Sequence, residues 1–347
     1  MRTVIAAGTF LFAALLLPDA GQTGTLRPES RQAESRQAAP EIAVKISDAQ
    51  RRRVAMDGVK TWAIQLRYLD RAALTTAPYD LVVIDHAPHP QKDIEIPFTP
   101  AEIAPLKVKS DGTRRIVLAY LSIGEAERYR YYWNPAWDVP DTRPNWLGTE
   151  NPRWPGDFAV HFANPDWQSV IFGEKDSYLD RIMNAGFDGV YLDRVDAYQD
   201  VEDTEPGAED AMTGFVQRLA DHAHRKNPDF LIIMQNAEEL AKSKSLLSRL
   251  DGIAKEDLLY GVANSEAANP EQMVLDTVNN LRKSKRAGLK VLVLEYVTAT
   301  EAIAATQRLS QREGFLLHIT DRMLGVMSPA TPSVTPSAGD PPATKLP

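Results

Sequence analysis

Eight short apolar segments, each bounded by polar turn residues, recur along the chain and limit the folds that it can adopt. Segments as continuously apolar as these are typical of parallel strands that are covered on both faces. Helical patterns separate most of them, and the clearest lie at 166–185, 208–225, 270–286 and 300–312. The predicted strands are 62–66, 80–85, 115–121, 187–193, 230–234, 251–254, 290–295 and 314–319.

Eight alternations of strand and helix predict an α/β fold, a single-domain (β/α)8 TIM barrel. A doubly wound open sheet is the alternative. No Gly-x-Gly-x-x-Gly or Walker-type loop follows any predicted strand, so the sequence carries no nucleotide-binding signature that would favour the open sheet.

The two ends of the chain differ from this central part. Residues 1–20 carry one positive charge and an apolar run of 14 residues, which predicts a secretory signal peptide, with an uncleaved anchor as the alternative. Residues 21–46 contain a direct repeat and no aromatic residue, and are predicted to be a disordered linker. Residues 328–347 contain six prolines and predict a disordered tail, which leaves 47–327 as the folded domain.

Composition narrows the possible functions. The chain has 39 basic and 47 acidic residues, so its net charge of −8 favours a cationic or neutral substrate over nucleic acid. The absence of cysteine excludes disulfides, thiolate metal sites and cysteine nucleophiles. No His-Glu-x-x-His pattern and no Gly-x-Ser-x-Gly elbow occur, so we expect neither a metal nor a serine nucleophile.

Acidic residues end most of the predicted strands, which is where a barrel of this kind carries its chemistry. Side-chain alternation places Asp193 on the face opposite Val190 and Leu192, so Asp193 is expected to point into the barrel mouth. Glu256 follows the sixth strand, roughly across the mouth. The other polar residues at strand ends include Asp85, Glu125, Asn236, Glu238 and Glu295.

Two carboxylates that face each other across a cleft are what glycosidic cleavage requires. One protonates the leaving oxygen, and the other attacks the anomeric carbon or activates water. The alternative for each single acid is a helix N-cap or one half of an ion pair.

A long insertion between the third and fourth predicted strands is rich in tryptophan and is expected to lack regular structure. Trp133 and Trp137 are predicted to bind sugar, because flat aromatic faces flanked by polar groups suit sugar rings. The alternative is a lid in which the tryptophans form their own small core. The tryptophans within these 35 residues are Trp133, Trp137, Trp146, Trp154 and Trp167.

A second biased segment, residues 188–210, contains nine acids and one base. It predicts either a solvated acidic loop or a cleft wall that faces a cationic amino sugar. Calcium binding is a third alternative, but the spacing of the acids matches no EF-hand loop.

Two motifs carry a resemblance to a known family: Tyr-Leu-Ser-Ile-Gly-Glu at 120–125 and Phe-Asp-Gly-Val-Tyr-Leu-Asp at 187–193. Over about 60–325 the chain resembles the endo-α-1,4-polygalactosaminidases and related glycoside hydrolases. The resemblance implies a TIM barrel that cleaves α-1,4-linked galactosamine polymers without a cofactor. It implies catalytic roles for Asp193, favoured as nucleophile or base, and Glu256, favoured as general acid. It also implies a sugar subsite formed by Asp85, Tyr120, Glu125, Tyr191, Asp196 and Asn236.

We therefore predict an exported, endo-acting glycoside hydrolase of amino-sugar polysaccharides. It is expected to be secreted or periplasmic and monomeric, with no stable membrane insertion after signal cleavage. A non-catalytic glycan-binding barrel is the first alternative. A metal-dependent deacetylase is the second, and it would need a His/Asp cluster that the sequence does not show.

Overall fold

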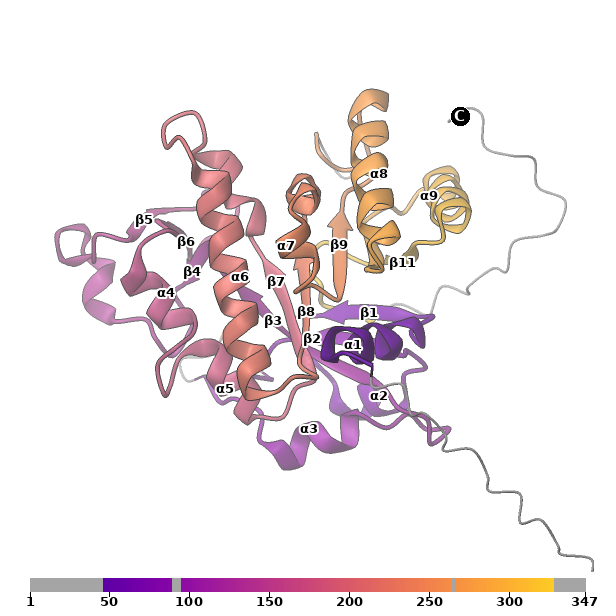
Figure 1. Ribbon diagram of the computed structural model, residues 1–347, viewed down its shortest axis with the longest axis horizontal. Helices are drawn as coiled ribbons and strands as arrows, with labels where there is room; N and C mark the ends of the chain where they lie inside the picture. Colours follow the sequence, from indigo (N-terminus) through magenta and orange to yellow (C-terminus); the bar gives the residue numbers. More distant parts are fainter. Residues whose placement is uncertain (1–45, 89–94, 264–265, 328–347) are drawn as a thin grey trace, which may run out of the picture. The chain divides into compact units, whose positions relative to one another are not determined.

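The computed structural model describes residues 46–88, 95–263 and 266–327 (Figure 1). The predicted signal peptide, nearly all of the predicted linker and the predicted tail lie outside these residues. Within the described residues, no helix combines the length and apolar character needed to cross a membrane.

Eight parallel strands form one sheet, and their order in the sheet is their order along the chain. An open doubly wound sheet would reverse its strand order at a switch point, which this one does not. The predicted (β/α)8 barrel is therefore confirmed, and all eight predicted strands are present. They are β1 (Trp62–Gln65), β2 (Leu81–Ile84), β3 (Ile116–Ser122), β7 (Gly189–Asp193), β8 (Leu231–Gln235), β9 (Gly252–Glu256), β10 (Lys290–Glu295) and β11 (Leu316–Ile319).

The barrel is closed between β1 and β11 by individual hydrogen bonds. The Trp62 indole N–H donates to the Leu316 carbonyl at 2.8 Å. Beyond the strands, the backbone amides of Leu66 and Arg67 both donate to the Leu324 carbonyl, at 2.9 and 3.1 Å. The segment after β11 is thus part of the closure.

Alternate residues of each strand face two separate apolar cores. Ile64 of β1 and Tyr191 of β7 belong to a core inside the barrel, whereas Ala63 and Val190 belong to a core between strands and helices. This is why the strands are apolar without interruption. The same alternation turns Asp193, at the carboxyl end of β7, toward the barrel axis.

Helices cover the outside of the barrel, and α6, α8 and α9 match the predicted helices 208–225, 270–286 and 300–312 (Figure 1). The helix α1 (Asp48–Asp57) precedes the first strand. Its Arg52 forms a buried ion pair with Asp251, 3.0 Å away at the amino-terminal end of β9, and its Met56 joins the inner core. The other covering helices are α2 (Arg71–Thr76), α3 (Pro100–Leu106), α6 (Ala208–Lys226), α7 (Lys244–Leu247), α8 (Glu271–Arg286) and α9 (Thr300–Glu313).

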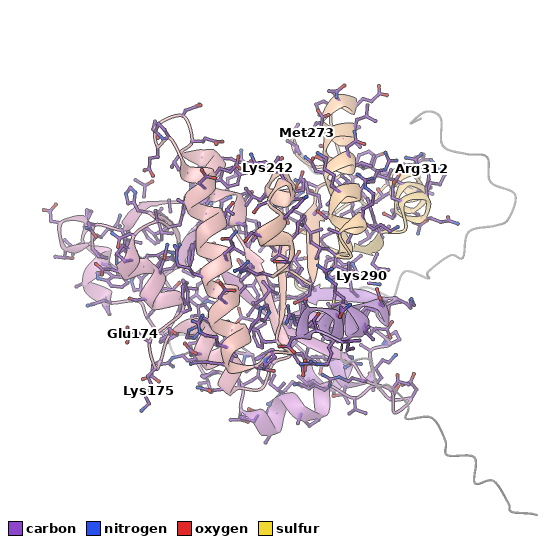
Figure 2. All side chains as sticks on the ribbon, viewed as in Figure 1. Glu174, Lys175, Lys242, Met273, Lys290 and Arg312 are labelled. Carbon is purple, nitrogen blue, oxygen red and sulfur yellow. The ribbon has the colours of Figure 1, made fainter. Side chains whose placement is uncertain are left out.

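The prediction of one helix over 166–185 is wrong, because two helices stand there: α4 (Pro165–Ile171) and α5 (Tyr178–Asn184). Gly173 has φ +107°, a conformation that ends a helix and that side chains disfavour. Glu174 and Lys175 lie in the connection between the two helices (Figure 2). Both helices bury one face, so the apolar periodicity continues across the break.

The insertion after β3 is also more regular than expected. It forms an antiparallel sheet of β4 (Glu125–Glu127), β5 (Leu147–Glu150) and β6 (Asp157–Val160), with short 3-10 turns at Pro135–Asp138 and Pro140–Thr142. Four tryptophans contact one another in series at ring-centroid distances of 5.4, 5.1 and 5.0 Å: Trp133, Trp137, Trp146 and Trp167. This aromatic series is continuous with the core between the barrel strands and the helices.

Gly124, between β3 and β4, is packed too tightly for any side chain. A Cβ at this position would lie 2.3 Å from the Arg194 carbonyl oxygen and 2.6 Å from the Ala197 Cβ. We expect Gly124→Ala to destabilise the protein by about 1–3 kcal/mol or more, measured by urea unfolding. Gly214→Ala, within α6, is the control and should be neutral or slightly stabilising. Equal stability of the Gly124 variant and the unsubstituted protein would contradict this packing.

Candidate active site

A cavity of about 350 Å³ opens where the barrel strands end and the insertion overhangs them. This is the size of a small ligand-binding pocket. Four arginines line it, together with eight acids: Asp85, Glu125, Glu127, Asp157, Asp193, Asp196, Glu256 and Asp257.

Arginines form ion pairs with five of these acids. The Arg194 side chain lies 3.2 Å from Glu125 and 3.2 Å from Asp196. Arg322 binds Asp257 with two hydrogen bonds, of 3.0 and 2.8 Å. The remaining two, Asp85 and Glu127, bind Arg130.

Arg130 is a fully buried cation at the centre of a carboxylate network. Its guanidinium contacts both oxygens of Asp85 at 2.9 Å, Glu127 at 2.6 Å and Glu95 at 3.1 Å. Burial alone would raise the pKa of Asp85, but the charges of Arg130 and His86 outweigh it and hold that pKa well below its usual range.

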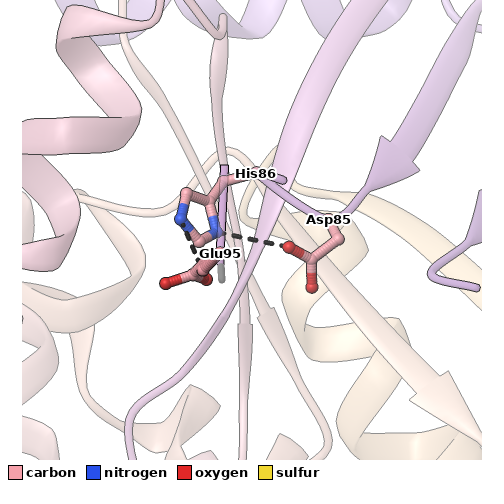
Figure 3. A group of neighbouring side chains, drawn as sticks. All are labelled: Asp85, His86 and Glu95. Carbon is pink, nitrogen blue, oxygen red and sulfur yellow. Dashed lines mark ion pairs between the residues drawn. The ribbon is translucent and has the colours of Figure 1, made fainter. Parts of the chain in front are cut away.

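His86 stands beside this network, between the carboxylates of Asp85 and Glu95 (Figure 3). The three residues bring potential metal-ligand atoms within 4.8 Å of one another. However, the Arg130 guanidinium lies 3.3 Å from His86 Nδ1 and also contacts both carboxylates. The positive charge that a metal would supply is therefore already present as a side chain.

Asp193 ends β7 and receives two hydrogen bonds. The Tyr120 hydroxyl donates to Oδ2 at 2.5 Å, and the Arg194 amide donates to Oδ1 at 2.8 Å. Burial raises the pKa of Asp193, and the charge of Asp196 adds to this effect, while the Tyr120 hydrogen bond opposes it. Among the described residues, no basic side chain forms a salt bridge with Asp193.

Glu256 ends β9. It accepts a hydrogen bond of 2.8 Å from the Tyr296 hydroxyl, and its backbone amide donates to the Asn236 side chain at 3.3 Å. Burial and the nearby charge of Asp193 raise the pKa of Glu256 to about 7, against the opposing effect of Tyr296. Glu256 also lacks a salt bridge within the described part of the chain.

Left-handed backbone conformations follow three neighbouring strands at this mouth. Arg194 after β7, Asn236 after β8 and Asp257 after β9 have φ values of 58°, 56° and 52°. Non-glycine residues adopt this region at a cost, and such strain gathers at functional sites. Here it turns the chain sharply beyond each strand, so that the side chains at the strand ends face the cavity.

The structure brings most of the predicted subsite residues together. Asp85, Tyr120, Glu125, Asp196 and Asn236 all line this cavity with Asp193 and Glu256.

The other three predicted residues lie elsewhere. Tyr191 is fully buried in the inner core, stacks on Trp62 and is not among the residues that line the cavity. Trp133 lines a second cavity, and Trp137 packs between Trp133 and Trp146.

The second cavity, of about 970 Å³, adjoins the first and is lined largely by residues of the insertion. Trp154, which is 36% exposed, lines both, as do Tyr129 and Asp157. Arg67 and Arg153 also line both cavities.

Part of the acidic segment 188–210 lies in the cleft wall, and part of it lies on the surface. Asp193 and Asp196 line the first cavity. Asp188 instead pairs with Lys107 at 2.7 Å, and Glu209 pairs with Lys242 at 2.6 Å. Lys242 lies at the surface (Figure 2).

Sequence reasoning missed Tyr296 and Asp157. Glu295 was noted as the residue that ends the seventh strand, but it is fully buried and its neighbour Tyr296 lines the cavity. Strict alternation from Leu294, which faces the inner core, would have identified Tyr296. Asp157 gave no such signal, because β6 was not predicted.

The Arg130 network yields a stability prediction. Arg130→Met leaves three buried carboxylates without their cation, so we expect a loss of about 3–5 kcal/mol in the free energy of unfolding. Arg128→Met is the matched control, because Arg128 is exposed and pairs with Asp138 at the surface; it should cost at most about 1 kcal/mol. Urea denaturation of both variants measures the difference, and similar losses would refute a central role for Arg130.

Comparison with known proteins places this chain in a family. The chain is 33% identical to an uncharacterized protein of Deinococcus radiodurans over 319 residues, which cover 90% of this chain and 96% of the relative. It is 34% identical to an uncharacterized protein of Methanocaldococcus jannaschii over 268 residues, 75% of this chain and 72% of the relative.

Among solved structures, the fold is similar to that of the glycoside hydrolase domain of PelA from Pseudomonas aeruginosa. The TM-score is 0.57 at 18% identity, with 78% of this chain and 98% of that chain covered. The model of glycoside-hydrolase family GH114 matches residues 43–334. The chain therefore belongs to glycoside-hydrolase family GH114 and is a glycoside hydrolase.

Proposed function

We propose that this glycoside hydrolase is an exported, monomeric enzyme that cleaves α-1,4-linked galactosamine-containing polysaccharide within the chain, using Asp193 and Glu256. The observation that carries the proposal is how the cavity acids are paired. Arginines bind five of the eight, whereas Asp193 and Glu256 each bind a tyrosine hydroxyl instead. A carboxylate that is not held in a salt bridge is available for proton transfer or nucleophilic attack.

The surroundings of the two acids favour different roles. Burial and the charge of Asp193 raise the pKa of Glu256 to about 7, so a large fraction of this carboxyl keeps its proton near neutral pH, which suits a general acid. Asp193 accepts two hydrogen bonds, which stabilise its ionised form and suit a nucleophile or base. Burial raises the pKa of both acids, and the second hydrogen bond of Asp193, from the Arg194 amide, is the difference that favours its role as nucleophile or base.

The reaction follows from these roles. Glu256 donates its proton to the glycosidic oxygen as the bond to the anomeric carbon breaks. Asp193 attacks that carbon or activates water, and the separation of the two carboxyl groups at the bound sugar decides between retention and inversion. Tyr120 and Tyr296 hold the two carboxyl groups in place.

Charge supports an amino sugar as the substrate. Eight acids and four arginines line the first cavity, which favours a positively charged group over an anion. The adjoining cavity supplies room for further sugar units, with Trp154 and Trp133 on its wall, and this supports cleavage within a polymer. Export is inferred from the apolar run at the start of the sequence.

The first test removes each carboxyl group. Asp193→Asn and Glu256→Gln should each lower the rate of reducing-end release from partially deacetylated galactosaminoglycan by about 10²–10⁴-fold. The Glu256→Gln substitution also affects stability. The pKa of Glu256 is 4.5 in the unfolded chain and about 7 in the folded protein, so the folded state loses stability as pH rises through this range. Glu256→Gln should therefore be at least as stable as the unsubstituted protein at pH 7.5.

Two controls complete this test. Asp203→Asn, in an exposed turn, should retain full activity. The dinitrophenolate of a dinitrophenyl glycoside leaves without being protonated, so Glu256→Gln should cleave such a substrate while Asp193→Asn does not. Full activity of both variants on the polymer would refute the assignment, and glycan binding without release of reducing ends would support a non-catalytic barrel.

The second test concerns pH. The general acid must be protonated, so kcat/KM should fall as pH rises through about 7. The Tyr296 hydrogen bond favours the ionised form of Glu256, so Tyr296→Phe should move this limb of the profile to higher pH. Tyr120→Phe should instead move the acidic limb upward, through Asp193. Movement of the same limb in both variants would contradict the separate roles.

A further inference from the structure

The small sheet of the insertion places like charges opposite each other. In the antiparallel pair of β4 and β6, Glu127 lies opposite Asp157, and Glu125 is two residues away on the same face. All three side chains line the first cavity. Like charges directly across a ladder destabilise a sheet, so this arrangement needs compensation.

Two of the three acids are compensated by arginine. Glu127 binds Arg130 at 2.6 Å, and Glu125 lies 3.2 Å from Arg194. Asp157 forms no salt bridge with any described residue, and its Oδ1 is buried without a hydrogen-bond partner. A buried polar atom without a partner is costly in a folded protein, and the cost calls for an explanation.

The charged groups around Asp157 disfavour the ionised form of its carboxyl. Burial raises its pKa to about 8, and the charges of Glu127, Glu125 and Asp193 add to this against the charge of Arg130. At neutral pH the carboxyl of Asp157 is therefore largely protonated, because no side chain among the described residues supplies the cation that its ionised form would need. Asp157 also lies where the two cavities meet, so a ligand in the cleft passes it.

We propose that Asp157 is the ammonium-binding residue of this cleft, which selects a sugar that bears a primary amine over its N-acetylated counterpart. The inference rests on the proposed function for the identity of the substrate class. An ammonium group supplies the missing cation and donates to the unpartnered oxygen. The carboxyl proton leaves to solvent as the ammonium–carboxylate pair forms, so binding of the cationic sugar releases a proton.

Asp157→Asn keeps the shape of the side chain and removes its charge. The probes are an α-1,4-galactosamine tetrasaccharide and its fully N-acetylated form, titrated calorimetrically at pH 6.5 in two buffers of different ionisation enthalpy. The unsubstituted protein should prefer the amine form, and Asp157→Asn should lose about tenfold or more in affinity for that form alone. Proton release on binding should decrease in the same variant.

Asp141→Asn, an exposed acid in a 3-10 turn away from both cavities, is the matched control and should behave as the unsubstituted protein. Asp157→Asn removes a repelled carboxyl, so its melting temperature should not fall, and a loss of binding is then separate from unfolding.

Two results would overturn the inference: unchanged selectivity in Asp157→Asn, or equal loss of both tetrasaccharides. Calcium binding that disappears in the variant would also overturn it, because the missing cation would then be a metal. Selective binding of the amine form without hydrolysis would leave the inference standing while refuting the proposed function. Hydrolysis of the polymer together with unchanged selectivity in Asp157→Asn would support the proposed function and refute the inference about Asp157.

Discussion

Mutual repulsion among eight carboxyl groups is the constraint around which the mouth of this barrel is built. In a cavity of about 350 Å³, so many acids cannot all be ionised without compensation. Arg130, Arg194 and Arg322 provide it for five of them. Asp157, Asp193 and Glu256 have no arginine partner among the described residues, and burial and their neighbours' charges raise their pKa values. Burial also raises the pKa values of Glu125 and Asp196, which share one arginine. The chemistry of the site depends on which acids the arginines leave free.

The architecture of the fold could be predicted because its signals are local. Uninterrupted apolar runs identified all eight strands, and alternation within β7 identified the direction of Asp193. The resemblance to a glycoside hydrolase family rested on segments of this kind at 120–125 and 187–193. Both signals lie within a few consecutive residues.

The pairing of charges could not be predicted, because it is not local. Arg130 meets Asp85 across 45 residues, and Arg322 meets Asp257 across 65. No periodicity records which acid such an arginine will reach. The same is true of Asp157, whose role depends on its register against Glu127 in a sheet built from three short strands. The tryptophan series failed as a simple indicator of sugar binding for a related reason: most of these rings stabilise the insertion by contacting one another.

The way the barrel is closed has a mechanical consequence for the cleft. The Trp62 indole joins β1 to β11, and two further bonds join the residues just after β1 to the Leu324 carbonyl, after β11. Arg322, Met323 and Leu324 are at the same time part of the wall of the first cavity. The segment that closes the barrel therefore also forms a wall of the cleft. Widening the cleft on this side would break the hydrogen bonds that close the barrel. The width available to a polymer is thereby tied to the integrity of the whole fold.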